Sequence, residues 1–340
     1  MAQDVAVPLE LEQSATRKSS GWRKGLDLAR KHPLGVFGLI IVVVLVFCGI
    51  FAELVAPYDP DQLDLLNKQA SPSLGHPFGT DHVGRDVFSR TVFGARISLM
   101  IGLVSVAVGT VLGASLGVVS GYFGKWVDSI IQRGVDILLA FPAVVLLLAI
   151  IAVIGDEDSA FRRFLNDSTP IPQGTFLGVP VFLDIFILSV GIGIAVAVGS
   201  IRVVRGAVLS LKENVYIDAA RAMGASDGRI MWKHIFPNVA ALVVVLASVF
   251  LPIAILAEAA ISFLGIGVPT GTPSWGADLN GERLDAQNGI WWPVFFPGLA
   301  LSLVVLGFNM LGDAFRDITD PRLRGSGGPG GGGRGSPGGL

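Results

Sequence analysis

The chain has 340 residues, of which 51% are hydrophobic and only 15% are charged, and its formal net charge is −2. Soluble domains carry about 25% charged residues, so this composition argues against a water-soluble protein and is typical of one that lipid surrounds. The sequence has no basic patch with interleaved aromatic residues, which speaks against nucleic acid as a partner. Its single cysteine, Cys48, excludes an intrachain disulfide.

Uncharged stretches divide the chain into candidate membrane spans. A spanning helix needs about 20 apolar residues, and one charge at its centre costs about 2.5–3.5 kcal/mol on the insertion scale. The first stretch is too long for a cleaved signal sequence, so we interpret it as a retained anchor. The six predicted spans cover residues 34–52, 97–124, 137–155, 185–201, 235–257 and 286–312.

Prolines refine this prediction. Residues 168–183 are also uncharged, but they contain three prolines, which indicate a loop. Pro142 and Pro252 fall within two of the spans, and we expect each to kink its helix. The spans themselves remain six in number.

Six spans place both termini on one side of the membrane. Most of the 25 Lys and Arg residues then lie on the side of the termini. The positive-inside rule therefore favours a multi-pass membrane protein with both termini in the cytoplasm. In this orientation we expect Trp275, Trp291 and Trp292 at the outer interface, where indole rings partition well.

The predicted organisation follows from these spans. The last segment is almost entirely Gly, Pro and Ser, so it cannot bury apolar surface and is expected to be disordered. The segments are a cytoplasmic tail over residues 1–33, a first transmembrane helix over 34–56, an external loop over 57–92, a five-helix core over 93–316 with an internal loop over 212–237, and a cytoplasmic Gly-rich tail over 317–340.

The long internal loop predicts a helix–turn–helix. Tyr216, Ala220 and Met223 share one helical face at spacings of four and three. Gly224 suits the end of that helix because it adopts positive φ without steric cost. Ser226 is a suitable N-cap for a second helix.

The second helix leads directly into the fifth span. Asp227 follows the predicted N-cap and is favourable at the positive end of the helix. Trp232 and Phe236 are four residues apart and are expected to stack. Pro237 lies where the fifth span begins. An element joined in this way to two spans is able to transmit force from a soluble partner, and the alternative is an amphipathic pair lying on lipid headgroups.

The same loop carries a resemblance to a known family. Asp218-Ala219-Ala220, with Gly224 and Pro237 following, resembles the coupling loop of ABC importers, whose pattern begins Glu-Ala-Ala and ends near Leu-Pro. Asp218 stands for the Glu, and Phe236 stands for the Leu. Both substitutions keep the chemical character of the position.

Further motifs resemble one branch of that family, the shorter-loop, dipeptide permease C-like subunit of dipeptide, oligopeptide and nickel importers. The resemblance covers roughly residues 30–324. The motifs that carry it are Gly79-Thr80-Asp81, Gly84-Arg85-Asp86, Ser89-Arg90, Gly94-Ala95-Arg96, Ser98-Leu99, Gly121-Tyr122, Asp128, Ser262-Phe263-Leu264-Gly265, Gly267, Pro269, Pro273-Ser274-Trp275-Gly276, Asn309, Leu311-Gly312-Asp313, Arg316-Asp317 and Asp320-Pro321-Arg322.

The resemblance implies an all-α membrane protein with six transmembrane helices in the ABC type-1 importer permease fold. It also implies a heterodimer with a homologous permease, two ABC ATPase subunits and an extracytoplasmic substrate-binding protein. The ATPases are expected to contact the coupling helix. The residues implied in that contact are Tyr216, Asp218, Ala219, Ala220, Arg221, Met223, Gly224 and Ala225.

The chain is expected to be non-catalytic. No Gly-x4-Gly-Lys-Ser/Thr phosphate loop occurs in it, so ATP and Mg²⁺ are expected on the ATPase subunits and no cofactor is expected here. The histidines are scattered along the sequence and predict no metal site. The resemblance implies peptide uptake, with nickel-chelate import as an alternative. A secondary transporter or channel is less favoured, because it would usually show inverted repeats or several intramembrane charges, and only Glu258 stands out within a span. A membrane scaffold is less favoured because it would not need the tight loop from Asp218 to Pro237.

A few other residues are candidates for function. Glu258 is an intramembrane carboxylate near the outer end of its span, and we consider both a role in the translocation pathway and a structural bond to a neighbouring helix. Arg85, Asp86 and Trp275 are candidates for external docking, although Arg85 and Asp86 are alternatively ties between the loop and the bundle. Asp59, Asp61 and Asp64 are either contacts for the binding protein or part of a solvated loop.

Overall fold

The computed structural model describes residues 30, 32–155, 159–168, 182–269 and 271–319. The predicted tails therefore lie almost wholly outside the described residues, as do the three prolines of the 168–183 loop. Within the described part the protein is helical, and the one β feature is an isolated bridge between Thr80 and Asp86.

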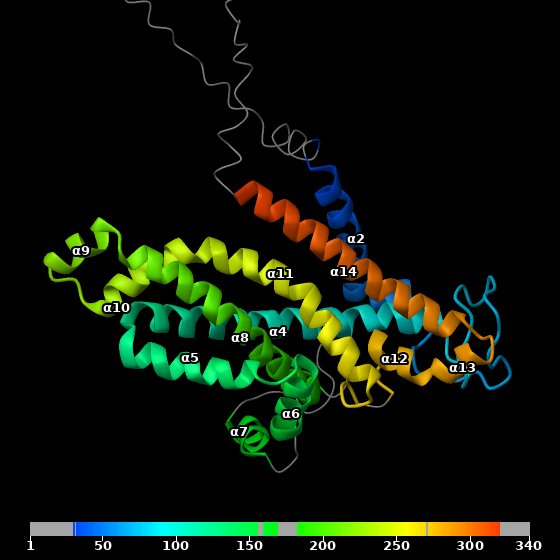
Figure 1. Cartoon of the computed structure of the whole chain (residues 1–340). Coiled ribbons are helices and arrows are strands. Elements are labelled where there is room, and N and C mark those ends of the chain that lie inside the picture. Colours follow the sequence, from blue (N-terminus) through cyan, green and yellow to red (C-terminus); the bar gives the residue numbers. More distant parts are fainter. Residues whose placement is uncertain (1–29, 31, 156–158, 169–181, 270, 320–340) are drawn as a thin grey trace, which may run out of the picture.

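The helices in chain order begin with α2 and are shown in Figure 1. Their bounds are α2 Pro33–Ile50, α3 Ala52–Val55, α4 Val87–Phe123, α5 Lys125–Leu139, α6 Ala143–Gly155, α7 Ala160–Ser168, α8 Phe182–Lys212, α9 Val215–Ala222, α10 Asp227–Ile230, the π-helix η1 Met231–Ile235, α11 Phe236–Phe263, α12 Trp275–Gly281, α13 Arg283–Gln287 and α14 Trp292–Thr319.

Five helical segments in the described ranges are long and apolar enough to cross a membrane, and a bent helix pair brings the number to six. The single segments are α2, α4, α8, the continuous run from α10 to α11, and α14. The chain is thus an all-α, multi-pass membrane protein, as the sequence predicts.

The third predicted span, residues 137–155, is bent at Pro142, as the sequence predicts. The helices α5 and α6 meet at an angle of 105°. Pro142 lies in the break, and its missing N–H and its constraint on the preceding residue explain why the helix stops there. The charge-gap criterion started this span too late, because α5 already begins at Lys125.

The second span likewise begins ten residues before the predicted position, at Val87. Two arginines in its first part find partners that offset their charge. Arg90 pairs with Asp278, with its terminal nitrogen 2.6 Å from the carboxylate, and Arg96 pairs with Glu53 at 2.6 Å. A criterion that counts charges along the chain cannot see these partners.

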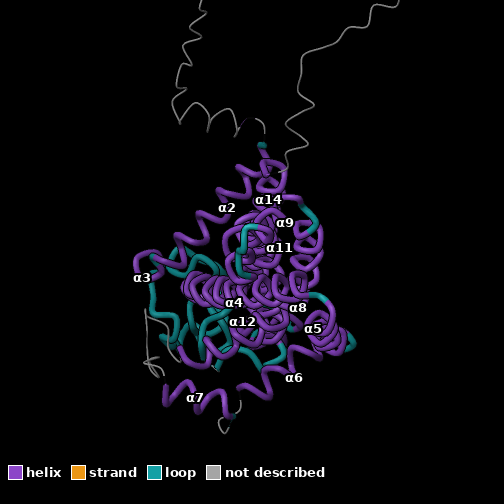
Figure 2. The backbone as a smooth tube through the Cα atoms, turned by 90° about the vertical axis from the view of Figure 1, so that its left-hand side faces the viewer, coloured by secondary structure: helices purple, strands orange, loops and turns teal. Residues whose placement is uncertain are grey.

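The helices α4 and α8 form the centre of the bundle. Figure 2 shows α4 with α2, α8, α11 and α12 around it, and the two central helices contact each other along their length. Their close approach depends on glycines spaced four apart on α4. A Cβ on Gly113 would lie 2.5 Å from that of Ser200, and one on Gly117 would lie 2.8 Å from that of Val204. Small residues are how membrane helices approach closely.

The bundle has two distinct ends (Figure 1). The first, which we call the α9 end, carries α9 and α10. The second, which we call the loop end, carries the segment 57–86 together with α12 and α13. Because α4 and the run from α10 to α11 each extend from one end to the other, they connect the two.

Candidate functional site

Helix α9 ends in a hydrogen-bonded turn that requires glycine. Gly224 has φ of +80°, in the region that side chains with a Cβ disfavour. Its N–H donates to the carbonyl of Arg221 at 2.9 Å, and the N–H of Ala225 donates to the carbonyl of Ala220 at 3.0 Å. This pair of bonds defines a Schellman motif, which satisfies the last carbonyls of a helix. The sequence-based prediction of a Gly224 C-cap is confirmed.

One side of α9 is fixed to the bundle. Ile217 is fully buried and Ala220 is 3% exposed. They belong to an apolar cluster that joins the ends of the three long helices α4, α8 and α11 to the short elements α9, α10 and η1. Its buried members are Val118, Tyr122, Val204, Val208, Ile217, Ala220, Ile230, Ile235 and Val239. Burial of such a cluster makes α9 a rigid extension of α4, α8 and α11.

Polar contacts strengthen the same attachment. The hydroxyl of Tyr122 at the end of α4 donates to Asp227 Oδ1 at 2.5 Å. The guanidinium of Arg221 lies over the ring of Tyr122, with its Cζ 5.6 Å from the ring centroid, in cation–π geometry. Asp218 and Arg221 also form an ion pair at 3.4 Å on the exposed side of α9.

The other side of α9 leaves apolar side chains uncovered. Val215 is 83% exposed, Met223 is 82% exposed and Tyr216 is 42% exposed. The predicted common face of Tyr216, Ala220 and Met223 is therefore wrong, because Ala220 is buried. Met223 lies at the C-cap, beyond the last helical residue, so the helical periodicity no longer sets its direction.

The other residues predicted to contact the ATPases also differ in their exposure to solvent. Asp218, Ala219, Arg221 and Gly224 are exposed, whereas Ala225 is half-buried. The exposed group and the three apolar side chains form one accessible edge, which is able to contact another protein.

The second helix of the loop continues directly into α11. From Asp227 to Phe263 the chain is helical without interruption. The turn is widened over η1, where the N–H of Phe236 donates to the carbonyl of Met231, five residues back. Pro237 follows and has no N–H to donate, which favours a wide turn at this point. Trp232 and Phe236 stack with centroids 4.9 Å apart, as predicted.

At the loop end the structure corrects three expectations. Trp275 is fully buried, and its indole N–H donates to the carbonyl of Thr91 at 3.0 Å. It is therefore neither at the interface nor available for docking. Asp86 is 2% exposed and caps α4 by accepting from the N–H of Ser89 at 2.7 Å. Sequence reasoning missed these roles because both depend on neighbours in space.

Arg85 and Glu258 are also held within the protein. Arg85 donates from Nε to Asp81 Oδ2 at 2.6 Å, which supports the alternative that it ties the loop together. Glu258 is fully buried, and Ser262 donates to its Oε1 at 2.8 Å. This burial supports the alternative of a structural bond, and a place for Glu258 in a translocation pathway stays a prediction.

Asp278 and Glu282, which the sequence did not single out, are central at this end. Asp278 accepts from Nε and a terminal nitrogen of Arg90 at 2.9 and 2.6 Å. Burial raises the pKa of Asp278, while the charge of Arg90 acts in the opposite direction. The sequence signal was weak: two acids four apart on α12 and its end, with the arginine 188 residues away.

Comparison with known proteins identifies the family. Residues 109–325, which include the whole of α9, match the family described as binding-protein-dependent transport system inner membrane component. The chain belongs to this family of transport permeases. Residues 20–72 of the permease match a second family, the N-terminal TM domain of oligopeptide transport permease C. The resemblance inferred from the motifs is thereby confirmed.

Individual relatives align with nearly the whole permease. The dipeptide transport system permease protein DppC of Alkalihalophilus pseudofirmus is 37% identical over 90% of this chain and 91% of its own. The oligopeptide transport system permease protein OppC of Bacillus subtilis is 34% identical over 93% and 94%. The glutathione transport system permease protein GsiD of Escherichia coli is 37% identical over 94% and 96%.

Proposed function

We propose that this permease forms, together with a homologous permease, the pathway by which peptides cross the bacterial cytoplasmic membrane. Two separate ATPase subunits, which bind ATP and Mg²⁺, drive the movement, and an extracytoplasmic binding protein delivers the substrate. This chain contributes no catalytic group. The relatives named for dipeptide, oligopeptide and glutathione transport support a peptide as the substrate.

The observation that carries this proposal is the construction of α9. One face is buried against helices that run through the membrane, and the other leaves Tyr216, Asp218 and Met223 exposed. A partner that moves this edge must move α8 and α11 with it. The interpretation of α9 and α10 as a pair lying passively on lipid does not account for Asp218 and Arg221 on the same exposed edge.

Charge supports placing the α9 end in the cytoplasm. Arg202, Arg205, Lys212, Arg229 and Lys233 all lie in or beside this loop. The loop end has a much more acidic segment between α3 and α4. By the positive-inside rule, this difference favours an orientation with α9 and both chain termini inside.

Purification of the assembly tests the proposal. The permease is expressed with its homologous permease and ATPases, and ATP-dependent uptake of a labelled dipeptide is measured in proteoliposomes. We expect Asp218→Ala to weaken co-purification of the ATPases, because it removes a charge from the exposed edge. The control is Asp64→Ala, a half-buried aspartate of the loop end.

Two results would contradict the proposal. One is uptake that proceeds without ATP, which would indicate a secondary transporter. The other is wild-type recovery of ATPases with Asp218→Ala together with loss of recovery with Asp64→Ala. Competition by a nickel chelate, but not by peptides, would replace peptide with the alternative substrate of the family.

A further inference from the structure

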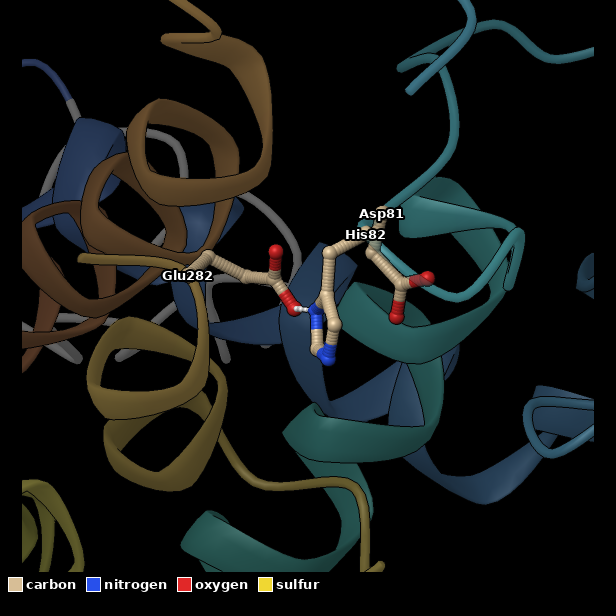
Figure 3. Close-up of side chains that lie close together, drawn as sticks. All are labelled: Asp81, His82 and Glu282. Atoms are coloured by element: carbon tan, nitrogen blue, oxygen red, sulfur yellow. Dashed lines mark hydrogen bonds and ion pairs between the residues drawn. The ribbon is translucent and has the colours of Figure 1, made fainter. Parts of the chain in front are cut away.

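Three ionisable side chains from distant parts of the sequence converge at the loop end. Asp81 and His82 lie in the segment before α4, and Glu282 lies between α12 and α13 (Figure 3). Each offers a ligand atom, and these atoms all lie within 4.8 Å of one another. Figure 3 shows the Glu282 carboxylate directed at the His82 ring, whose Nδ1 is 2.7 Å from Glu282 Oε1.

Glu282 has an unused ligand atom inside the protein. The residue is 3% exposed, and no donor in the described chain reaches its Oε2. The carboxyl of Asp285, whose own Oδ2 is likewise buried without a donor, lies beside that of Glu282. A buried acceptor without a partner is costly, and such atoms point to an occupant. Glu282 also lines a small cavity of about 10 Å³ with Asp81, Arg90 and Asp278, and Asp278 Oδ2 is a second buried oxygen without a partner in the described chain.

The charges around this cavity do not balance when every acid is ionised. The carboxylates of Asp81, Asp278 and Glu282 line the cavity, and that of Asp285 lies beside Glu282. Their neighbours are two guanidinium groups and the imidazole of His82, which is charged only when protonated. Arg90 is committed to Asp278, and Arg85 donates to Asp81, while its terminal nitrogen is 3.9 Å from Glu282. The remaining negative charge requires either protons or a cation.

The Glu282 carboxyl shows this imbalance directly. Burial, followed by the charge of Asp81, raises its pKa to about 7, and the neighbouring carboxyl of Asp285 adds to the rise. His82 acts in the opposite direction but does not offset these effects.

We propose that Asp81, His82 and Glu282 form a binding site for a divalent transition-metal ion of the Zn²⁺ class. One imidazole with two carboxylates is a donor set that suits Zn²⁺, which takes such ligands at about 2.0–2.2 Å and often keeps one position for water. The His82 side chain is 41% exposed, which gives the ion access from solvent.

Ligation requires a modest rearrangement. Asp81 Oδ1 already accepts two backbone N–H groups, from Val83 and Arg85. The ion therefore takes Oδ2 and displaces the guanidinium of Arg85, whose side chain is partly exposed. The bound ion would fasten the segment before α4 to the junction of α12 and α13, so it is a structural ion and not transported cargo.

The test measures binding of Zn²⁺ alone to the full chain in lipid nanodiscs, purified with a histidine-free tag and stripped with chelator. Equilibrium dialysis followed by elemental analysis is expected to find about one Zn²⁺ per chain. His82→Ala and Glu282→Gln are each expected to weaken binding by at least about tenfold. Because the experiment measures Zn²⁺ binding and not uptake, its outcome does not depend on the proposed transport function.

His76→Ala is the matched control. His76 pairs with Asp86 at 2.9 Å, as His82 pairs with Glu282, but it belongs to no three-residue cluster among the residues described. We expect it to bind Zn²⁺ as the wild type does. The proposal is overturned if the wild type binds none, which would mean that protons alone balance the cluster, or if His76→Ala loses binding as His82→Ala does. If Glu282→Gln does not fold, Zn²⁺ binding by His82→Ala, a change at an exposed residue, tests the proposal alone.

Discussion

The two ends of the permease differ in where their charges lie. At the loop end, Arg90, Asp278 and Glu282 are each less than 10% exposed, and they line the same small cavity. At the α9 end, Asp218 and Arg221 have side chains 70% and 46% exposed, beside uncovered apolar residues. A region whose charged groups are buried and paired across distant segments holds those segments together, whereas one that leaves both charge and apolar area open is suited to a partner. The loop end therefore maintains the fold, and the α9 end is where we expect force to enter.

The largest effect that would test this contrast is loss of a buried charge at the loop end. Asp278→Ala leaves Arg90 buried without its main partner, and breaking such a pair costs about 3–5 kcal/mol. Asp61 contacts the same arginine at 3.2 Å, but its side chain is 63% exposed. Asp61→Ala is therefore expected to cost no more than about 1 kcal/mol. Thermal unfolding in nanodiscs measures both, and equal losses would contradict the assignment of Asp278.

A smaller effect is expected where α4 and α8 touch. Gly113→Ala inserts a Cβ 2.5 Å from that of Ser200, and overpacking of this kind costs about 1–3 kcal/mol. Gly206 also lies on α8, but a Cβ there meets nothing within 4 Å in the described structure. Gly206→Ala is expected to leave the melting temperature unchanged or to raise it. If both variants melt together, the two helices do not require glycine at this contact.

The smallest effect on stability, but the most specific for function, is expected at the α9 turn. Gly224→Val forces a β-branched residue to positive φ, at a cost of about 1–2 kcal/mol in the left-handed region. Gly228, four residues later, has ordinary backbone geometry, and a Cβ there is unobstructed by the described residues. We expect Gly224→Val, but not Gly228→Val, to abolish stimulation of ATPase activity by substrate-loaded binding protein. Normal stimulation of ATPase activity in Gly224→Val would show that coupling does not require the α9 turn.

Local signals explain what could be predicted from the sequence. The α9 turn was predictable because Gly224 and Pro237 act on their own neighbourhood, and α2 was predictable because its apolar run has no competing interpretation. The start of α11 at Phe236 follows from the same local chemistry.

Long-range pairing explains what could not be predicted. The early start of α4 depends on Arg90 meeting Asp278, which is 188 residues away. His82 and Glu282 are 200 residues apart, so the histidines looked scattered although one of them lies beside two acids. Trp275 appeared interfacial because its type favours membrane surfaces, yet the space between α4 and α11 buries it. Sequence spacing contains no record of these contacts.

The most direct test of the central claim is a cross-link from the exposed edge of α9. Met223→Cys is placed in a Cys48→Ser background, and the assembled transporter is treated with a bifunctional reagent that joins a thiol to neighbouring amines. We predict a product between this chain and an ATPase subunit whose yield changes when nucleotide is added. A product with the extracytoplasmic binding protein, or labelling of Met223→Cys by an impermeant thiol reagent from outside intact cells, would contradict the account.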